Sequence, residues 1–338
     1  MRSPLPDHQS EGGPADPRPA FSAHRPLALC AFAMALLAVF SLAGVLISDR
    51  EVLGENNWLK PLKFAISFSL YAATLAWLMS RVRRWRRTLW WSGTAVVVLF
   101  LVPETALIVL QAIRGVPSHF NTGTAFDETV FRAMGGAAYI GWLLTALLGL
   151  FLARGQRLEP AAAWAVRLGF VVSLAGMSVG YLMTAPTPDQ AQALDHGADL
   201  AVVGSHTIGA DGGGRMPFTG WETGGGDLRV PHFAGVHALQ ALPLLALGLQ
   251  RLAKRRPLLG RQAVRTRLVC LGAVAYAGLF ALLLMQALND ESVLSPSLPT
   301  AISGIGILAG TAIMAALILG TSGRRPATPR PEADVPVR

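Results

Sequence analysis

The chain has 338 residues, of which 52% are hydrophobic and only 14% are charged, and its mean hydropathy is +0.44. A soluble globular protein carries about 25% charged residues, so this composition excludes a water-soluble domain, a disordered chain and a coiled coil. The formal net charge of +9 would suggest nucleic acid as the partner of a soluble protein, but in a membrane protein basic residues first report topology. We therefore expect the lipid bilayer, and no nucleic acid, as the partner.

Eight stretches of the sequence are apolar over about 20 residues, the length that a helix needs to cross a bilayer. They are 27–48, 62–80, 88–113, 131–153, 163–184, 232–250, 268–288 and 299–320. The first stretch has no convincing small-residue cleavage site before Arg50, so we interpret it as an anchor rather than a signal peptide. The predicted fold class is an all-α polytopic membrane protein, a bundle of about eight transmembrane helices with one long outer loop.

The sequence divides into five parts. We expect a disordered tail, five helices, a Gly-rich outer loop, three further helices and a second disordered tail, which correspond to residues 1–25, 26–184, 185–230, 231–321 and 322–338. Both tails are rich in proline and charge, a composition typical of disorder.

Basic residues lie in alternate connections between the apolar stretches. Of the 29 Lys and Arg residues, 22 fall in the two tails and in the connections after the second, fourth and sixth stretches. The positive-inside rule makes this side, with both termini, cytoplasmic, and we expect a plasma membrane of the bacterial inner-membrane type. The other side and the helix interiors hold 14 of the 20 acidic residues, and the outer half holds five of the seven histidines: His119, His196, His206, His232 and His237.

The outer loop 185–230 differs in composition from the other connections. Its stretch Gly204–Gly226 contains nine glycines interleaved with polar residues and Trp221. A loop this long is either functional or disordered, and the glycines supply the positive φ angles that sharp bends require. We expect this stretch to form a folded lid rather than a linker.

Glu104 is the strongest candidate site residue, because it lies deep inside the third stretch, where an ionisable group costs roughly 2.5–3.5 kcal/mol to insert. Pro103 before it favours a kink. Gln111 shares its helix face, and Arg114 and His119 follow at the outer end, which predicts a polar stripe that climbs to the water. The alternative is a buried carboxyl group, protonated or paired, that only holds helices together.

The second stretch begins with two of the three lysines of the chain, Lys60 and Lys63. Lys63 shares a helix face with three further polar residues: Ser67, Tyr71 and Thr74. An ammonium at the outer mouth of a helix can bind an anionic ligand as a point charge. Snorkelling of both lysines to lipid headgroups is an equally good explanation.

The sixth stretch carries His232 and His237, which are five residues apart. A regular helix turns about 140° over that distance, so it cannot direct both side chains at one metal ion. A metal site would therefore need His119 or His206 as well. His237 and Gln240 do share a face.

Asp227 and Arg229 stand just before His232. They fit partners that orient the imidazole of a metal-binding histidine, or a surface ion pair that contributes little.

Three classes of function fit these residues. The first is a metal- or haem-dependent membrane enzyme with an outward-facing site, in which Glu104 acts as a base or proton relay, Lys63 and Arg114 hold an anionic group of a small-molecule ligand, and four histidines are metal ligands: His119, His206, His232 and His237. The second is a small-solute or proton-coupled transporter. The third is a non-catalytic binding or assembly protein. The two cysteines lack the motifs of c-type haem and iron–sulfur clusters.

A short internal match links the second and sixth stretches. Leu59-Lys60 with Lys63-Phe64-Ala65 corresponds to Leu228-Arg229 with His232-Phe233-Ala234, at an offset of 169 residues. Such a match would suit a parallel duplication of four helices, but it does not extend into the later helices.

Overall fold

The computed structural model describes residues 24–323 apart from residues 83, 156–157 and 210–212. It is 74% helical. The tails predicted at 1–25 and 322–338 lie almost entirely outside the described residues.

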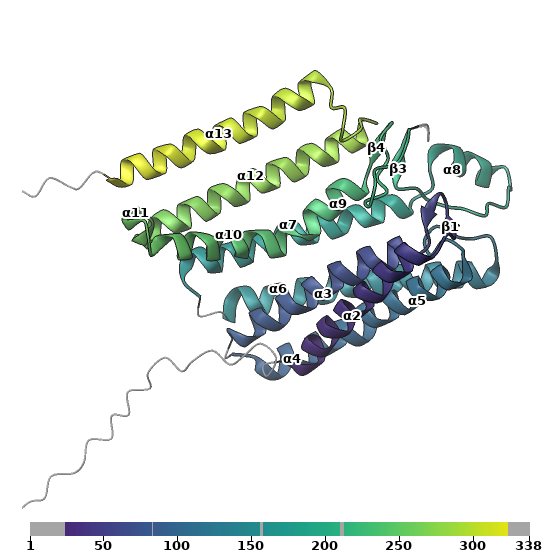
Figure 1. Cartoon of the computed structure of the whole chain (residues 1–338), viewed down its shortest axis with the longest axis horizontal. Coiled ribbons are helices and arrows are strands. Elements are labelled where there is room, and N and C mark those ends of the chain that lie inside the picture. The colour runs from purple at the N-terminus through teal and green to yellow at the C-terminus, as the bar shows by residue number, and fades with distance from the viewer. Residues whose placement is uncertain (1–23, 83, 156–157, 210–212, 324–338) are drawn as a thin grey trace, which may run out of the picture.

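Seven described helices are long and apolar enough to cross a membrane, and an eighth span results if one bent pair of helices is counted as a unit. The seven are α2 (Arg25–Ile47), α3 (Leu59–Ser80), the continuous run Arg86–Arg114, α6 (Ala125–Gly155), α7 (Pro160–Thr184), α12 (Gln262–Leu288) and α13 (Leu298–Gly323). The bent pair is α9 (Arg229–Val236) with α10 (Ala238–Ala253). These helices run side by side along one axis (Figure 1), which agrees with the predicted all-α membrane bundle.

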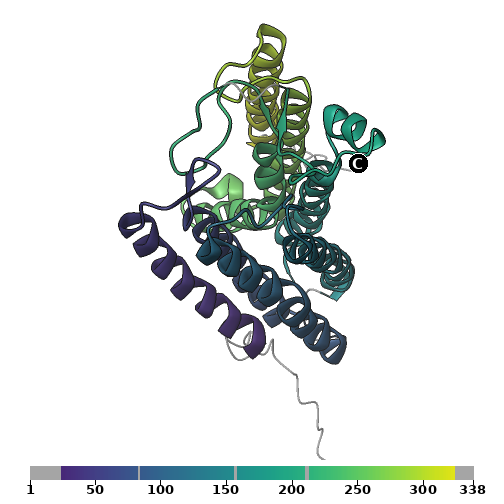
Figure 2. The same ribbon diagram turned by 90° about the vertical axis from the view of Figure 1, so that its right-hand side faces the viewer.

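The helices form two groups that face each other (Figures 1 and 2). The first group contains α2 to α6, whose main core is built from leucine, valine and phenylalanine side chains such as Leu75, Leu101 and Leu148. The second group contains α7, α9, α10, α12 and α13, and a second core joins α7, α10 and α12 through residues such as Ala165, Leu242 and Val269. The small alanines of this second core let the helices approach closely.

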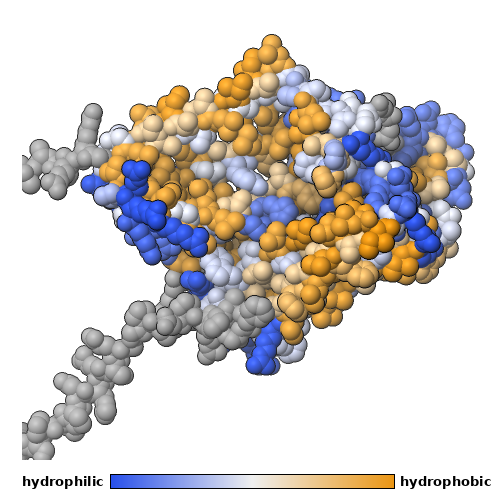
Figure 3. All heavy atoms as spheres, in the orientation of Figure 1, coloured by the Kyte–Doolittle hydropathy of each residue, from blue (hydrophilic) through white to orange (hydrophobic). Residues whose placement is uncertain are grey.

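Short elements gather at one end of the bundle, which we call the loop end (Figure 1). They are the hairpin β1 (Glu51–Val52) with β2 (Glu55–Asn56), helix α8 (Pro188–Asp195), and the antiparallel pair β3 (Thr207–Ile208) with β4 (Gly226–Asp227). The opposite, arginine-rich end carries α11 (Pro257–Gly260). Figure 3 shows hydrophobic residues concentrated between the two more hydrophilic ends, the arrangement that a bilayer requires.

The third span contains a wide turn that the sequence analysis did not predict. Helix α4 (Arg86–Val96) passes through the π-helical turn η1 (Val97–Leu101) into α5 (Val102–Arg114), and the Val102 N–H donates to the Val97 carbonyl five residues earlier. Pro103 follows directly; in a regular α-helix its ring would clash with the carbonyl four residues back. The wider turn relieves this clash, and π turns of this kind frequently accompany functional sites.

The sixth span is not the single regular helix that was expected over 232–250. Its two parts meet at His237 with a bend of 45°. The Gln240 N–H donates to His237 O rather than continuing the regular pattern to Val236 O. Val236 O instead accepts the Ser173 hydroxyl at 3.0 Å. Irregular backbone at membrane depth is tolerated where other groups satisfy it in this way.

Candidate functional site

A cavity of about 580 Å³ lies between α3 and the bent pair α9–α10, with α5, α6, α7 and the loop end completing its walls. Most ionisable candidates from the sequence line it, together with residues that the sequence analysis did not single out. The charged and polar lining residues include Glu55, Lys60, Lys63, Ser67, Tyr71, Glu104, His119, Arg132, His206, Arg215, Arg229, His232, His237 and Gln240. The cavity therefore brings together side chains that are far apart in the sequence.

The rest of the wall is mainly apolar and aromatic. Six phenylalanines line the cavity, namely Phe64, Phe68, Phe100, Phe120, Phe131 and Phe233. Several of them pack edge to face, as in the pair Phe68 and Phe100 with ring centres 5.2 Å apart. An apolar wall with a few converging polar groups is the usual character of a small-molecule site.

Glu104, His119 and Lys60 form one connected group. His119 Nε2 lies 3.5 Å from Glu104 Oε1, and Lys60 Nζ lies 3.0 Å from His119 Nδ1. Glu104 is only 3% exposed, and within the described part of the chain its Oε2 has no hydrogen-bond partner. A buried carboxylate oxygen without a partner is costly, so this oxygen is poised to accept a donor from a bound molecule.

The hydrogen-bond pattern selects one tautomer of His119. An ammonium can only donate, so Lys60 requires an unprotonated Nδ1, and Nε2–H then points at Glu104. Burial, with a further contribution from the Lys60 ammonium, lowers the pKa of His119 against the opposing effect of Glu104. The imidazole is therefore neutral at neutral pH and lies between the side chains of Lys60 and Glu104.

The loop after α5 holds His119 in place. Gly115 ends the helix in the left-handed conformation with a φ of 72°, a conformation that favours glycine. Phe120 is also left-handed, with a φ of 64°, and its carbonyl accepts the Val203 N–H at 2.9 Å. Backbone strain in a residue with a large side chain persists only where its surroundings fix it, and here the segment around Val203 does so.

His237 at the bend contacts α3 across the cavity. Its Nε2 lies 3.4 Å from Ser67 Oγ, and its Nδ1 lies 3.3 Å from Gln240 Oε1. The predicted shared face of His237 and Gln240 therefore corresponds to a direct contact.

His232 is oriented by a backbone carbonyl rather than by the charged residues before it. Its Nδ1 lies 2.9 Å from Gly176 O, which can only accept, so Nδ1 carries the hydrogen and Nε2 is free. Asp227 and Arg229, interpreted either as partners that orient this imidazole or as an ion pair, form an ion pair with 2.7 Å between Oδ2 and Nη2. The carbonyl that contacts His232 belongs to the neighbouring helix α7.

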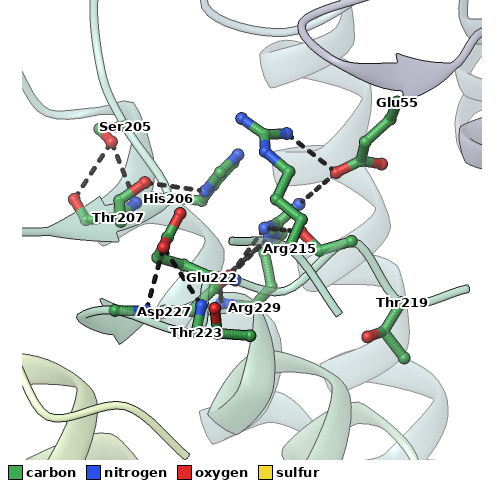
Figure 4. Close-up of polar contacts among 12 residues, drawn as sticks. Glu55, Ser205, His206, Thr207, Arg215, Thr219, Glu222, Thr223, Asp227 and Arg229 are labelled. Atoms are coloured by element: carbon green, nitrogen blue, oxygen red, sulfur yellow. Dashed lines mark hydrogen bonds and ion pairs between the residues drawn. The ribbon is translucent and has the colours of Figure 1, made fainter. Parts of the chain in front are cut away.

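A cluster of charges fastens the Gly-rich loop to α3 (Figure 4). Glu55 accepts from Lys63 at 3.3 Å, from Arg215 at 3.1 Å and from Arg229 at 3.3 Å. Lys63 also donates to Thr219 O at 2.9 Å. Burial alone would raise the pKa of Glu55, but the three cations lower it overall. Loop and helix are therefore joined by charge-assisted bonds, which are stronger than neutral ones.

The same loop is held internally by Asp227, which is 3% exposed. Asp227 Oδ2 accepts the Glu222 N–H at 2.9 Å, and Arg229 reaches back to Gly220 O at 2.5 Å. Gly220 has a φ of +65°, and a Cβ there would lie 2.1 Å from Glu55 Oε1, so a larger residue would strain the backbone and displace the Glu55 carboxylate. Burial and the charge of Arg229 lower the pKa of the nearby His206 to about 4.

Two members of the predicted polar stripe lie outside the cavity. Gln111 Nε2 donates to Asp127 Oδ1 at 2.8 Å, and Arg114 forms an ion pair with the same carboxylate. Asp127 lies in the first turn of α6, and the Thr124 hydroxyl donates to its Oδ2 at 2.7 Å. These residues connect α5 to α6, whereas Glu104 and His119 face the cavity.

Trp221 and Asp227 are also absent from the described cavity wall. Trp221 packs against Phe233, with ring centres 6.5 Å apart, and so supports the loop. His196 is exposed at the end of α8 and takes no part.

Four histidines predicted as metal ligands line the cavity, namely His119, His206, His232 and His237. Among the described residues, no three His, Cys, Asp or Glu side chains are placed so that they could hold one metal ion. Ligation of a metal ion or haem by these histidines stays a prediction.

Glu55 and Arg215 are the main lining residues that the sequence analysis missed. Both lie in short, polar connections where charged residues are ordinary. A signal was nevertheless present in Gly54-Glu55-Asn56, a turn sequence directly before the two outer lysines. The position of Arg215 depends on how the glycine loop folds, which its composition does not determine.

No family model matches the chain, and neither a curated protein nor a solved structure matches it significantly.

Proposed function

We propose that this multi-pass membrane protein binds an anionic, largely apolar small molecule in the outer half of the bilayer. The observation that carries the proposal is the composition of the cavity wall. Its described residues combine six phenylalanines with five basic side chains and two carboxylates: Lys60, Lys63, Arg132, Arg215 and Arg229 against Glu55 and Glu104. The loop end is the outer side on the positive-inside rule, because most basic residues lie at the other end.

The cations at the loop end suit the charged head of such a ligand. Lys63, Arg215 and Arg229 share the carboxylate of Glu55, and Arg229 also pairs with Asp227. Among these described residues, three cations therefore face two carboxylates. A carboxylate or phosphate group of a ligand would accept charge-assisted hydrogen bonds from these side chains. Lys63 supplies the compact charge that the two extended guanidinium groups do not.

The phenylalanine wall suits an apolar ligand body. Burial of apolar surface contributes about 25 cal/mol per Å², and a cavity of about 580 Å³ falls within the size range of small-molecule sites. Glu104, with its unpartnered Oε2, would accept a hydroxyl or water hydrogen on the ligand side of the cavity. The cations therefore suit the charged group of the ligand, the phenylalanines suit its apolar part, and Glu104 suits a hydroxyl hydrogen.

The test uses protein reconstituted into phosphatidylcholine nanodiscs and equilibrium binding of radiolabelled dodecyl phosphate. We expect saturable binding, and weaker binding of dodecyltrimethylammonium, which has the same chain and the opposite charge. Lys63→Gln removes one charge-assisted contact, so the dissociation constant rises about tenfold or more. Equal binding of the two probes would overturn the proposal.

The third lysine of the chain, Lys254, provides a matched control. It lies at the arginine-rich end, so Lys254→Gln removes the same charge far from the cavity. We expect its dissociation constant for dodecyl phosphate to equal that of the unchanged protein. An equal loss in both variants would indicate a general effect of surface charge.

Transport of the same anion is a second candidate, and the broken span favours it. Interrupted helices that line a cavity are a recurring feature of transporters, and α9–α10 is bent by 45° at the cavity wall. Flux of dodecyl phosphate into proteoliposomes, compared between the unchanged protein and Glu104→Gln, tests this candidate. Binding without flux would leave the protein a binding protein, and equal flux in both forms would remove Glu104 from the mechanism.

A further inference from the structure

We propose that Ser67 is a nucleophile activated by His237, with Gln240 as a positioning residue, and that the ligand is an ester that joins an apolar acyl chain to an anionic group. This inference rests on the proposed function, because the ester has to enter the same cavity. It follows from the direction of one chain of hydrogen bonds and from the contrast between Ser67 and the other helix hydroxyls.

The chain of hydrogen bonds has one consistent direction. Thr74 donates its hydroxyl hydrogen to Leu70 O at 2.7 Å, so its oxygen accepts from Gln240 Nε2 at 3.4 Å. Gln240 therefore turns Oε1 toward His237 Nδ1, 3.3 Å away. An amide oxygen can only accept, so Nδ1 carries the hydrogen of the neutral imidazole.

His237 Nε2 is then left with a lone pair that faces Ser67. The Ser67 hydroxyl, 3.4 Å from Nε2, is the donor of this contact. A nucleophile, a base and a group that orients the base are the three parts of an activated serine site. The distance is longer than an ideal hydrogen bond, as is common in sites without bound substrate.

Ser67 differs from most described hydroxyls of the helices. Outside the helices, the hydroxyls of Ser118 and Thr207 also contact imidazoles, each that of an adjacent residue. Serine and threonine in helices usually donate to the carbonyl three or four residues earlier, as Thr74, Thr105, Thr145 and Ser178 do here. Ser69, two residues from Ser67, donates to Ala31 O of the neighbouring helix at 2.9 Å. Among the described residues, the one hydrogen-bond contact of the Ser67 hydroxyl is the imidazole of His237.

The bend of the sixth span explains why this imidazole faces α3. His237 is both the residue that ends α9 and the residue that precedes α10, so its orientation is set by neither helix alone. Both Ser67 and His237 line the cavity. A substrate held between the phenylalanines would therefore meet the hydroxyl and the base together.

The reaction is an acyl transfer to water in two steps. Ser67 Oγ attacks the ester carbonyl carbon while its proton passes to His237 Nε2, and the alcohol leaves with that proton as the C–O bond breaks. A water molecule then gives its proton to His237 and attacks the acyl-serine. The carboxylic acid is released as the proton returns to Ser67 Oγ. Over the two steps, two C–O bonds of the acyl carbon form and two break, so no redox partner is needed.

The first experiment is covalent labelling of the full chain in nanodiscs with an alkyl fluorophosphonate. Attack by Ser67 Oγ forms a P–O bond and releases fluoride, and peptide mass spectrometry locates the adduct. We expect the adduct on Ser67, its loss in His237→Gln, and unchanged labelling in Ser69→Ala, which removes a hydroxyl from the same helix without touching an imidazole. Absence of an adduct on Ser67, or equal labelling in His237→Gln, would overturn the inference.

The second experiment separates binding from chemistry. We expect saturable binding of dodecyl phosphate by the unchanged protein and at least a 100-fold loss of ester hydrolysis in Ser67→Ala. Normal binding by the unchanged protein without any labelling would refute the serine site and leave the proposed function intact. Loss of binding in the unchanged protein would refute both.

The role of Gln240 is tested by hydrolysis of dodecanoyl esters at several pH values. Gln240→Leu should lower kcat with little change in KM. The substitution removes the acceptor that fixes the tautomer of His237, but it removes no contact with the ligand. Gln240→Glu retains an acceptor oxygen and should restore kcat while shifting its pH profile upward, since a carboxylate favours the protonated imidazole. A parallel loss of folding and activity in both variants, without a shifted profile, would contradict the positioning role.

Discussion

Helix α3 and the bent pair α9–α10 face each other across the cavity and begin with similar residues. α3 starts with Lys60 and Lys63, and α9 starts with Arg229 and His232. α3 is continuous over 22 residues and contains no glycine, whereas the pair bends by 45° at His237. The two sides of the cavity therefore carry similar basic residues at the loop end. Deeper in the bundle they differ, because one side is a continuous helix and the other is bent.

The two spans also differ in how each packs against its neighbour. α3 packs on α2 and contributes Ala72 and Leu75 to the core that also contains Leu27 of α2. α9 instead meets α7 backbone to backbone, because a Cβ on Gly176 would lie 2.5 Å from the Gly235 Cα. The bend at His237 lies two residues beyond this close contact at Gly235, whereas α7, which supplies Gly176, stays continuous over 25 residues.

Gly176→Leu is expected to have the largest effect, because its side chain would push α9 away from α7. Overpacking against backbone should destabilise the fold by about 3 kcal/mol or more, measured as the free energy of unfolding in a denaturing detergent. Gly306→Leu on α13 is the control, since a Cβ there meets nothing within 4 Å. Equal stability of the two variants would show that the close approach of α7 and α9 is unimportant.

Ser173→Ala should have the next largest effect, because it leaves Val236 O without its donor at the bend. We expect a loss of about 1–2 kcal/mol in unfolding free energy. Ser69→Ala on α3 removes a bond to a helix carbonyl of α2, and it should cost only about 0.5 kcal/mol. A larger loss for Ser69→Ala would contradict the idea that the bend depends on donors from α7.

Glu55→Gln removes the carboxylate that joins α3 to the loop before α9. We expect a stability loss of about 1 kcal/mol, because the pairs are only partly buried. Hydrogen exchange in 213–227 should become faster. Glu51→Gln, an exposed position on the same hairpin, should leave exchange unchanged, and faster exchange in both variants would argue against a specific anchor.

Acidification should destabilise the fold through His206. Its pKa is about 4 in the folded protein because of burial and Arg229, and about 6.5 in an unfolded chain. The neutral form is therefore favoured by folding, so this contribution to stability is complete above pH 6.5 and declines as the pH falls toward 4. His206→Gln should flatten the melting temperature over this range, and His196→Gln, at an exposed position, should leave it unchanged; a steeper decline in His206→Gln would contradict the assignment.

The sequence predicted the spans well because apolar length is a local property. The expected stretch 27–48 corresponds to Arg25–Ile47, and 268–288 lies within Gln262–Leu288. The bend at His237 could not be predicted in this way, since it depends on Gly176 and Ser173 of another helix. No local pattern around residue 237 reports those contacts.

The candidate site was only partly predictable for a similar reason. Glu104 and His119 meet because one helix and a short loop connect them. Gln111 and Arg114 are as close to Glu104 in the sequence, but they bind Asp127 instead of lining the cavity. Asp127 is available because α6 begins at Ala125 rather than near residue 131 as expected. The partner of a polar residue was decided by where the next helix starts, a boundary that hydropathy determines poorly.

The π turn at Val97–Leu101 acts as a spacer of one residue. Each residue turns an α-helix by about 100°, so the extra residue rotates everything beyond the turn relative to everything before it. The turn itself keeps Phe100 against Gly141 of α6, while the half after it points Glu104 into the cavity. Deletion of a single residue from this turn would preserve the length and hydropathy of the span and swing the carboxylate away from His119. The hydropathy of the span would therefore not reveal that the contact between Glu104 and His119 had been lost.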